Sequence, residues 1–163
     1  VNLGKSSALK TGCDAAMILG TDLIALMDSD GQHNPDDLPR FFQAIEKEDL
    51  DIVVGSRLGG DKMPFIRKYG NLLLEYTSKV LFHIDIKDIQ SGFRVFRSDI
   101  YAKIKWLSNN YHADAEMTIQ IAINKLKYKE IYIETIYLDD YKGMTPVDGL
   151  LLLFNLIKWR IIL

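Results

Sequence analysis

Short apolar runs alternate along this chain with longer segments whose apolar residues recur at helical spacing. Strand-like runs occupy residues 22–27, 51–55, 92–96 and 130–138, and helical patterns occupy residues 6–19, 35–47, 64–82, 98–105 and 113–127. Strands that alternate with helices favour a largely parallel sheet covered by helices on both faces. The pattern therefore predicts an α/β fold, and 163 residues are enough for one domain.

The most informative polar residues directly follow the first strand-like run. Asp28, Asp30 and Gln32 stand at alternate positions after the apolar residues 23–26. Ligands of open α/β sheets bind at the carboxyl ends of strands, and oxygen atoms at this spacing suit a hard cation such as Mg²⁺ or Mn²⁺. Such triplets also occur in ordinary turns, where an aspartate bonds its own backbone. The later motifs favour the metal-binding interpretation.

The composition argues against several classes of protein. The net charge is −2 and the pI about 5.9, so the chain lacks the overall basic field of a nucleic-acid-binding protein. A single cysteine, Cys13, leaves no partner for a disulfide within these residues and no cysteine-rich zinc site. Its helical surroundings favour a small core residue. A reduced cysteine fits a cytoplasmic protein.

Five motifs follow one another in a recognisable order. They are Asn2-x-Gly4-Lys5, Asp28-x-Asp30-x-Gln32-x-x-Pro35, Gly55-Ser56-Arg57, Gln90-Ser91-Gly92-Phe93-Arg94 and Ala115-Glu116-Met117. In this order they resemble the family-2 glycosyltransferases of the GT-A fold, especially the polyprenyl- or dolichyl-phosphate sugar synthases. The resemblance covers essentially the whole chain. It implies an inverting, metal-dependent transfer of one hexose from a nucleotide-sugar (GDP- or UDP-hexose) to a polyprenyl phosphate. It also implies that nucleotide-binding strands precede Val1, so we expect an N-terminally truncated domain.

The resemblance assigns the donor side of the site to the first motifs. Asp28, Asp30 and Gln32 would hold Mg²⁺ or Mn²⁺, which neutralises charge developing on the diphosphate leaving group, although Asp28 could instead touch the ribose. Lys5 at a helix start would bind the donor, with a solvated surface lysine as the alternative. Gly92 would let the main chain approach the donor closely.

The resemblance assigns the acceptor phosphate to basic and polar residues further along the chain. Arg57 and Arg67 would bind it, because the guanidinium fork matches phosphate oxygens. Asn71 and Lys142 would add contacts. For Arg57 the alternative is a salt bridge at a strand end, and for Arg67 a solvated helix position. Arg94 would reach a phosphate or brace the acidic residues.

Two further carboxylates leave the identity of the acceptor open. Asp114 and Glu116 occupy the helix in which hydroxyl-acceptor relatives keep a general base, whereas a polyprenyl phosphate is already ionised and needs none. The first hypothesis is therefore transfer to a lipid phosphate, and the second is transfer to a saccharide hydroxyl. A non-catalytic, partner-binding fragment and a phosphatase with an Asp-x-Asp nucleophile are the remaining alternatives.

Two segments are more apolar than a helix buried on one face requires. Residues 63–82 favour a surface that faces lipid or a partner, or a helix buried on two sides. Residues 146–163 predict an amphipathic or membrane-proximal helix that follows a catalytic domain at 1–145, with docking on the domain as the alternative. We therefore expect a protein at the cytoplasmic face of a membrane, bound at its periphery.

Overall fold

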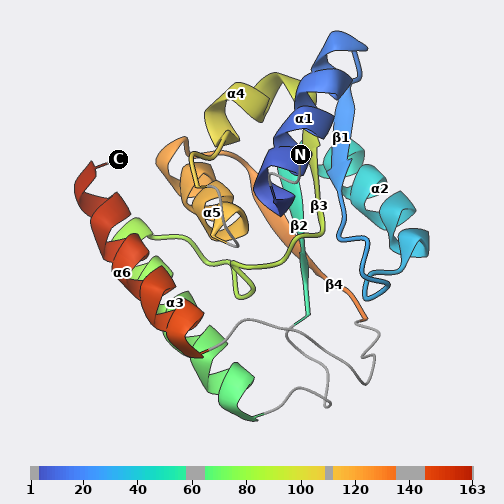
Figure 1. The fold of residues 1–163 in the computed structure, drawn as a ribbon. Helices are drawn as coiled ribbons and strands as arrows, with labels where there is room; N and C mark the ends of the chain where they lie inside the picture. Colours follow the sequence, from blue (N-terminus) through green and yellow to red (C-terminus); the bar gives the residue numbers. More distant parts are fainter. Residues whose placement is uncertain (1–3, 58–64, 109–111, 135–145, 163) are drawn as a thin grey trace.

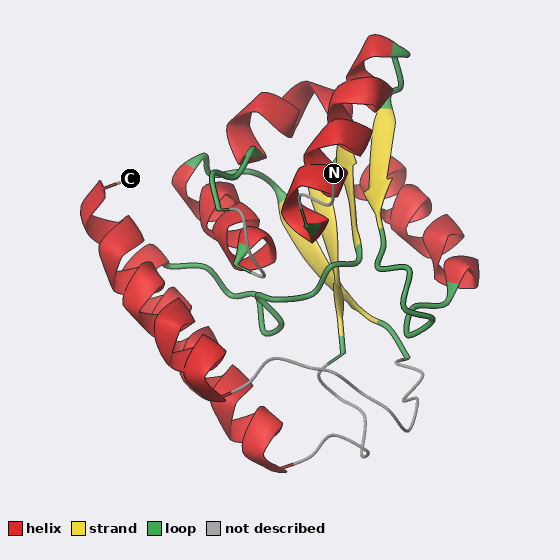
Figure 2. Ribbon diagram, in the orientation of Figure 1, coloured by secondary structure: helices red, strands yellow, loops and turns green. Residues whose placement is uncertain are grey.

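The computed structural model describes residues 4–57, 65–108, 112–134 and 146–162, and shows helices packed around one mixed sheet (Figures 1 and 2). Within these residues the strands are ordered β1-β3-β2-β4. β3 is antiparallel to both β1 and β2, and β4 is parallel to β2. Three of the four strands thus run in one direction, with β3 inserted against them. The strands are β1 (Leu23–Leu26), β2 (Ile52–Ser56), β3 (Arg94–Arg97) and β4 (Tyr128–Tyr132).

The helices occupy the expected parts of the chain, with differences at their ends. They are α1 (Lys5–Ile18), α2 (Leu38–Glu48), α3 (Phe65–Phe82), α4 (Tyr101–Ile104), α5 (Ala113–Ile123) and α6 (Pro146–Ile162), with 3₁₀ turns at Pro35–Asp37 and Ser98–Ile100. Asn34 caps the first 3₁₀ turn, since its side chain accepts a hydrogen bond from the Asp36 N–H at 3.1 Å. The helix expected to reach residue 127 ends at Ile123, because Lys125 adopts a left-handed conformation with φ of 51°. The α/β fold expected from the sequence is confirmed.

The sheet separates two apolar clusters, and the central strand supplies side chains to both. Ile52 and Val54 belong to the larger cluster, whereas Val53 between them belongs to the smaller cluster with Phe41 of α2. Alternation along β2 places successive side chains on opposite faces of the sheet. The strand therefore reads as a continuous apolar run because both of its faces are buried.

The last helix packs along α3 (Figure 1). Leu152, Leu156 and Trp159 of α6 are buried in the larger cluster, so one side of this helix docks on the domain. Among the described residues, no helix combines the length and apolar character needed to cross a bilayer. Docking of α6 on the domain was one of the two interpretations left open by its sequence.

Replacement of Ile52 by alanine tests the two-faced core. Ile52 is fully buried, so Ile52→Ala should lower the free energy of unfolding by about 2–5 kcal/mol. Ile18→Ala is the matched control, because Ile18 is 86% exposed and its truncation should change stability by about 0.5 kcal/mol or less. Urea unfolding followed by circular dichroism measures both. Equal losses for the two variants would contradict the proposed core.

Candidate functional site

The polar motifs meet at one edge of the sheet. β1 and β2 end there, and antiparallel β3 begins there, because Leu26 and Val54 both pair with Arg94. The residues that follow β1, those that follow β2 and those that precede β3 are consequently neighbours. Motifs separated by tens of residues in the sequence are brought together by the reversed direction of β3.

Lys5 links two of the candidate carboxylates. Its Nζ lies 2.6 Å from Asp28 Oδ1 and 3.0 Å from Asp114 Oδ2. Gly4 precedes it with φ of 82°, a left-handed conformation that glycine adopts without strain, and α1 begins at Lys5. Burial lowers the pKa of Lys5, but Asp114 and Asp28 more than offset this, and its pKa lies above the ordinary value. Lys5 is therefore a cation shared by two acids.

Gly92 packs directly against the Asp28 carboxylate. A Cβ atom built on Gly92 would lie 2.6 Å from Asp28 Oδ2, closer than atoms can approach. The absence of a side chain at residue 92 lets the chain between β2 and β3 pack on the Asp28 carboxylate without displacing it. Gly92 thus places the main chain against the first acidic residue of the motif.

The acidic loop after β1 is shaped by its own backbone bonds. Asp30 is exposed, and its Oδ1 accepts a hydrogen bond from the Gln32 N–H at 3.0 Å, while Gly31 is left-handed with φ of 79°. His33 is buried and its Nδ1 accepts a hydrogen bond from the Asp28 N–H at 3.3 Å. This role of His33 does not follow from the sequence, which shows only that the residue lies beside the acidic motif.

His33 also joins the loop to the smaller apolar cluster. Its ring stacks on Phe93 with centroids 5.3 Å apart, and Phe93 stacks on Phe41 of α2 at 4.6 Å. Burial lowers the pKa of His33. This agrees with a neutral ring that accepts a hydrogen bond at Nδ1.

No ready-made protein cage for a metal exists among residues 4–57, 65–108, 112–134 and 146–162, where no three His, Cys, Asp or Glu side chains are grouped to hold an ion. Asp28 shares one oxygen with Lys5, and Asp30 is exposed beside it. Gln32 is buried in the same loop. A cation at this edge would need oxygen ligands from a bound phosphate as well.

Arg57 forms a forked ion pair with Asp88. Its Nε and Nη2 donate to Asp88 Oδ2 and Oδ1 at 2.7 and 2.9 Å, and its backbone N–H donates to Oδ2 at 3.2 Å. Burial by itself raises the pKa of Asp88, but Arg57 more than offsets this and the pKa is lowered. The salt bridge that the sequence offered as the alternative for Arg57 is therefore present in the structure.

Arg94 is fully buried and braces the turn that precedes β3. Its Nε donates to the Ser91 carbonyl at 2.9 Å, and its Nη2 donates to the Ile89 carbonyl at 3.1 Å and to Thr118 Oγ1 at 2.8 Å. Burial lowers the pKa of Arg94, while Asp114, Asp88 and Asp28 act in the opposite direction. The hydrogen bonds given for Arg94 go to two backbone carbonyls and a threonine hydroxyl, so neither the phosphate contact nor the bracing of acidic residues expected for it is among them.

The two carboxylates of α5 have different surroundings. Asp114 is buried, and burial raises its pKa although Lys5 and Arg94 oppose the shift. Glu116 accepts backbone hydrogen bonds from Leu107 and Ser108 at 2.8 and 2.9 Å. Glu116 therefore fixes the backbone at residues 107 and 108.

The remaining candidates lie partly outside the described structure. Lys142 falls outside the described residues. Arg67 belongs to α3, but its side chain is not among those described. Asn71 is half-buried on the same helix. Arg57 is therefore the acceptor candidate for which the structure describes an ion pair.

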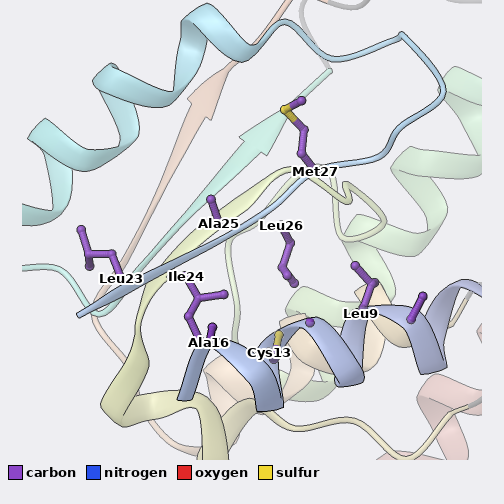
Figure 3. A pocket seen from close by; sticks show the side chains of 10 residues that line it. Leu9, Cys13, Ala16, Leu23, Ile24, Ala25, Leu26 and Met27 are labelled. Atoms are coloured by element: carbon purple, nitrogen blue, oxygen red, sulfur yellow. The ribbon is translucent and has the colours of Figure 1, made fainter. Parts of the chain in front are cut away.

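A separate pocket of about 330 Å³ lies between α1 and β1 (Figure 3). Its lining contains no charged or hydrogen-bonding side chain apart from the Cys13 thiol. Burial raises the pKa of Cys13 to about 11, so the thiol stays protonated at neutral pH. The pocket is thus distinct in chemistry from the polar edge, and Cys13 fits the core role expected for it.

Comparisons with known proteins agree with the order of the motifs. The family model described as Glycosyl transferase family 2 matches residues 1–105. A UDP-N-acetylglucosamine–dolichyl-phosphate N-acetylglucosaminyltransferase of Methanococcus voltae is 37% identical over 83% of the chain and 57% of its own length. An undecaprenyl-phosphate mannosyltransferase of Micrococcus luteus is 28% identical over 80% and 55%. A dolichol-phosphate mannosyltransferase of Pyrococcus furiosus is 29% identical over 96% and 46%. The chain thus spans about half the length of these relatives.

Substitution of Gly92 tests the close approach to Asp28. Gly92→Ala should lower the free energy of unfolding by about 1–3 kcal/mol, because the added methyl group displaces either the turn or the Asp28 carboxylate. Gly12→Ala is the matched control: no atom lies within 4 Å of its Cβ position, and alanine in a helix should stabilise by up to about 1 kcal/mol. Urea titrations compare them, and an unchanged stability for Gly92→Ala would disprove the contact.

Proposed function

Because the chain belongs to glycosyl transferase family 2, we propose that it moves one hexose from a nucleotide-sugar to a polyprenyl phosphate, with inversion at the anomeric carbon. The relatives named above act, by their names, on dolichyl or undecaprenyl phosphates. The observation that supports the proposal most strongly is the meeting of Asp28, Lys5 and Gly92 at the edge of the sheet where Arg57 follows β2.

The donor side of the proposal rests on the acidic loop. Asp30, with Asp28 and Gln32, would hold Mg²⁺ or Mn²⁺ together with diphosphate oxygens. The carboxylate and amide oxygens of these side chains are ligands that such an ion prefers. When bound, the ion would neutralise charge on the leaving diphosphate. Lys5 would contribute positive charge at the start of α1, where N–H groups also favour an anion.

The acceptor side of the proposal rests on Arg57. A polyprenyl phosphate carries its own negative charge, so its oxygen can attack the anomeric carbon without a general base. Asp114 is buried and paired with Lys5, which argues against its reaching the hydroxyl of a saccharide acceptor. This surrounding favours the lipid phosphate over the saccharide hydroxyl.

Support for a membrane site comes from the exposed faces of α3 and α6. Both helices carry large apolar side chains that are exposed: Tyr69, Leu72, Leu73, Tyr76 and Val80 on α3, and Leu150, Leu151, Phe154, Ile157 and Ile161 on α6. Lys158 and Arg160 are exposed among the latter and would suit anionic headgroups. We propose that this α3/α6 surface lies on the cytoplasmic face of a membrane, which would bring a lipid phosphate to the site.

Transfer assays with radiolabelled UDP- or GDP-hexose test the donor assignment. Asp30→Ala should reduce the Mn²⁺-dependent rate of transfer to polyprenyl phosphate by about 100-fold, because a ligand of the charge-neutralising ion is lost. Asp36→Ala is the control, since Asp36 is also an exposed aspartate of this region and should leave the rate unchanged. Transfer to a saccharide instead of the lipid phosphate, or an unchanged rate for Asp30→Ala, would contradict the proposal.

Vesicle flotation tests the membrane surface. Tyr76→Glu combined with Phe154→Glu should weaken binding to vesicles that contain anionic lipid by at least about tenfold, because two exposed aromatic side chains lose their apolar contact. Ile18→Glu introduces the same charge at an exposed apolar position of α1 and should leave binding unchanged. An equal effect of all these substitutions would argue against the α3/α6 surface.

A further inference from the structure

Asp88 forms an ion pair with Arg57, the arginine proposed to bind the acceptor phosphate. Both of its carboxylate oxygens accept hydrogen bonds from Arg57, and the residue is only 1% exposed. We propose that Asp88 is a positioning residue, which holds the Arg57 guanidinium in one orientation for the acceptor phosphate. This inference rests on the proposed function, since it assumes that Arg57 binds that phosphate.

The burial of Asp88 makes separation of the Arg57–Asp88 ion pair unfavourable. A buried carboxylate that loses its ion-pair partner is strongly destabilised, because water does not replace the lost hydrogen bonds. Arg57 itself remains 19% exposed at the side chain, so the pair combines a buried acid with a cation that reaches the surface. Arg57 therefore stays attached to Asp88 and meets a ligand from a fixed place, whereas an unattached arginine would first have to be ordered.

Glu130 fixes Asp88 in turn. Its Oε1 accepts hydrogen bonds from the backbone N–H groups of Lys87 and Asp88 at 3.1 and 2.9 Å. Glu130 lies on β4 opposite Val54 of β2, the strand that leads to Arg57. Arg57 is thus held at the end of β2, and Asp88 is held by a side chain of the neighbouring strand β4.

The same turn connects the acceptor side with the donor side. The Asp88 carbonyl accepts a hydrogen bond from the Ser91 N–H at 3.2 Å, and the next residue is Gly92, which packs on Asp28. Residues 88–92 therefore set the separation between Arg57 and the acidic loop. In-line transfer depends on this separation, because the attacking and leaving oxygens must face opposite sides of one carbon.

A double-mutant cycle tests whether Asp88 acts through Arg57. Arg57→Met, Asp88→Asn and the double variant are compared by the KM for polyprenyl phosphate, the KM for nucleotide-sugar and kcat. Each single substitution should raise the acceptor KM by about tenfold, the scale of losing a charged hydrogen bond, and leave the donor KM within about twofold. The double variant should be no worse than Arg57→Met, because the two residues form one unit.

The outcomes separate the inference from the proposed function. An unchanged acceptor KM for Arg57→Met would overturn the acceptor assignment, and the inference with it. A raised KM for Arg57→Met with an unchanged KM for Asp88→Asn would overturn the inference alone. The inference would also be overturned if the acceptor KM of the double variant rose by the product of the two single increases. A rise in the donor KM of Asp88→Asn as large as the rise in its acceptor KM would overturn it as well. Asp85→Asn, at an exposed aspartate paired with Lys79, is the matched control and should change no constant.

Substitutions of Glu130 keep the test decisive if Asp88→Asn does not fold. Glu130→Ala removes the acceptor for both backbone N–H groups and should raise the acceptor KM. Glu130→Gln retains an oxygen acceptor and should restore the KM to the wild-type value. Thermal unfolding identifies folded variants. Equal acceptor KM values for Glu130→Ala, Glu130→Gln and the wild type would count against the positioning role.

Discussion

A cluster of opposite charges at the carboxyl edge of the sheet is the constraint on which the site depends. Arg94 is fully buried at this edge, where the charges of Asp114, Asp88 and Asp28 oppose the lowering of its pKa by burial. Lys5 and Arg57 pair with these acids from the outside, so three anions face three cations. Breaking a fully buried ion pair costs about 3–5 kcal/mol, and the cost is smaller where water reaches the charges, as at Lys5 and Asp28, whose side chains are 33% and 27% exposed. The charges therefore hold the loops of the site in one arrangement.

The cluster has two sides that serve different parts of the proposed reaction. In the proposed reaction, Asp28 and Lys5 would bind the nucleotide diphosphate and its cation, and Arg57, held by Asp88, would bind the lipid phosphate. Gly92 and the turn before it separate the two sides by a fixed length of chain. A phosphate acceptor needs positive charge and orientation but no base. The arrangement thus supplies preorganised charge, which is the main demand of transfer between two phosphates.

Much of this arrangement could be predicted from local patterns. The strand before Asp28, the helix that begins at Lys5 and the fully apolar strand before Arg57 follow from periodicity and turn residues. The family was also recognisable, because Asp28, Arg57 and Gly92 lie in short motifs typical of it, and the family match over residues 1–105 confirms that assignment. The roles of His33, Asp88 and Glu130 could not be predicted in the same way. Their partners lie 5, 31 and 42 residues away, and only the folded chain brings the more distant ones together.

The sequence by itself determined the α/β class, the family and the residue types available for the chemistry, because these depend on local spacing and composition. The tertiary structure decided which of those residues form ion pairs with one another. It placed β3 against the direction of its neighbours, so that Gly92 meets Asp28 and Arg94 is buried beside the turn that precedes β3. It also paired Arg57 with Asp88. Glu116, in turn, accepts a hydrogen bond from the backbone of Leu107. The physical reason is that ion pairing and desolvation depend on distance and burial, which no local pattern specifies.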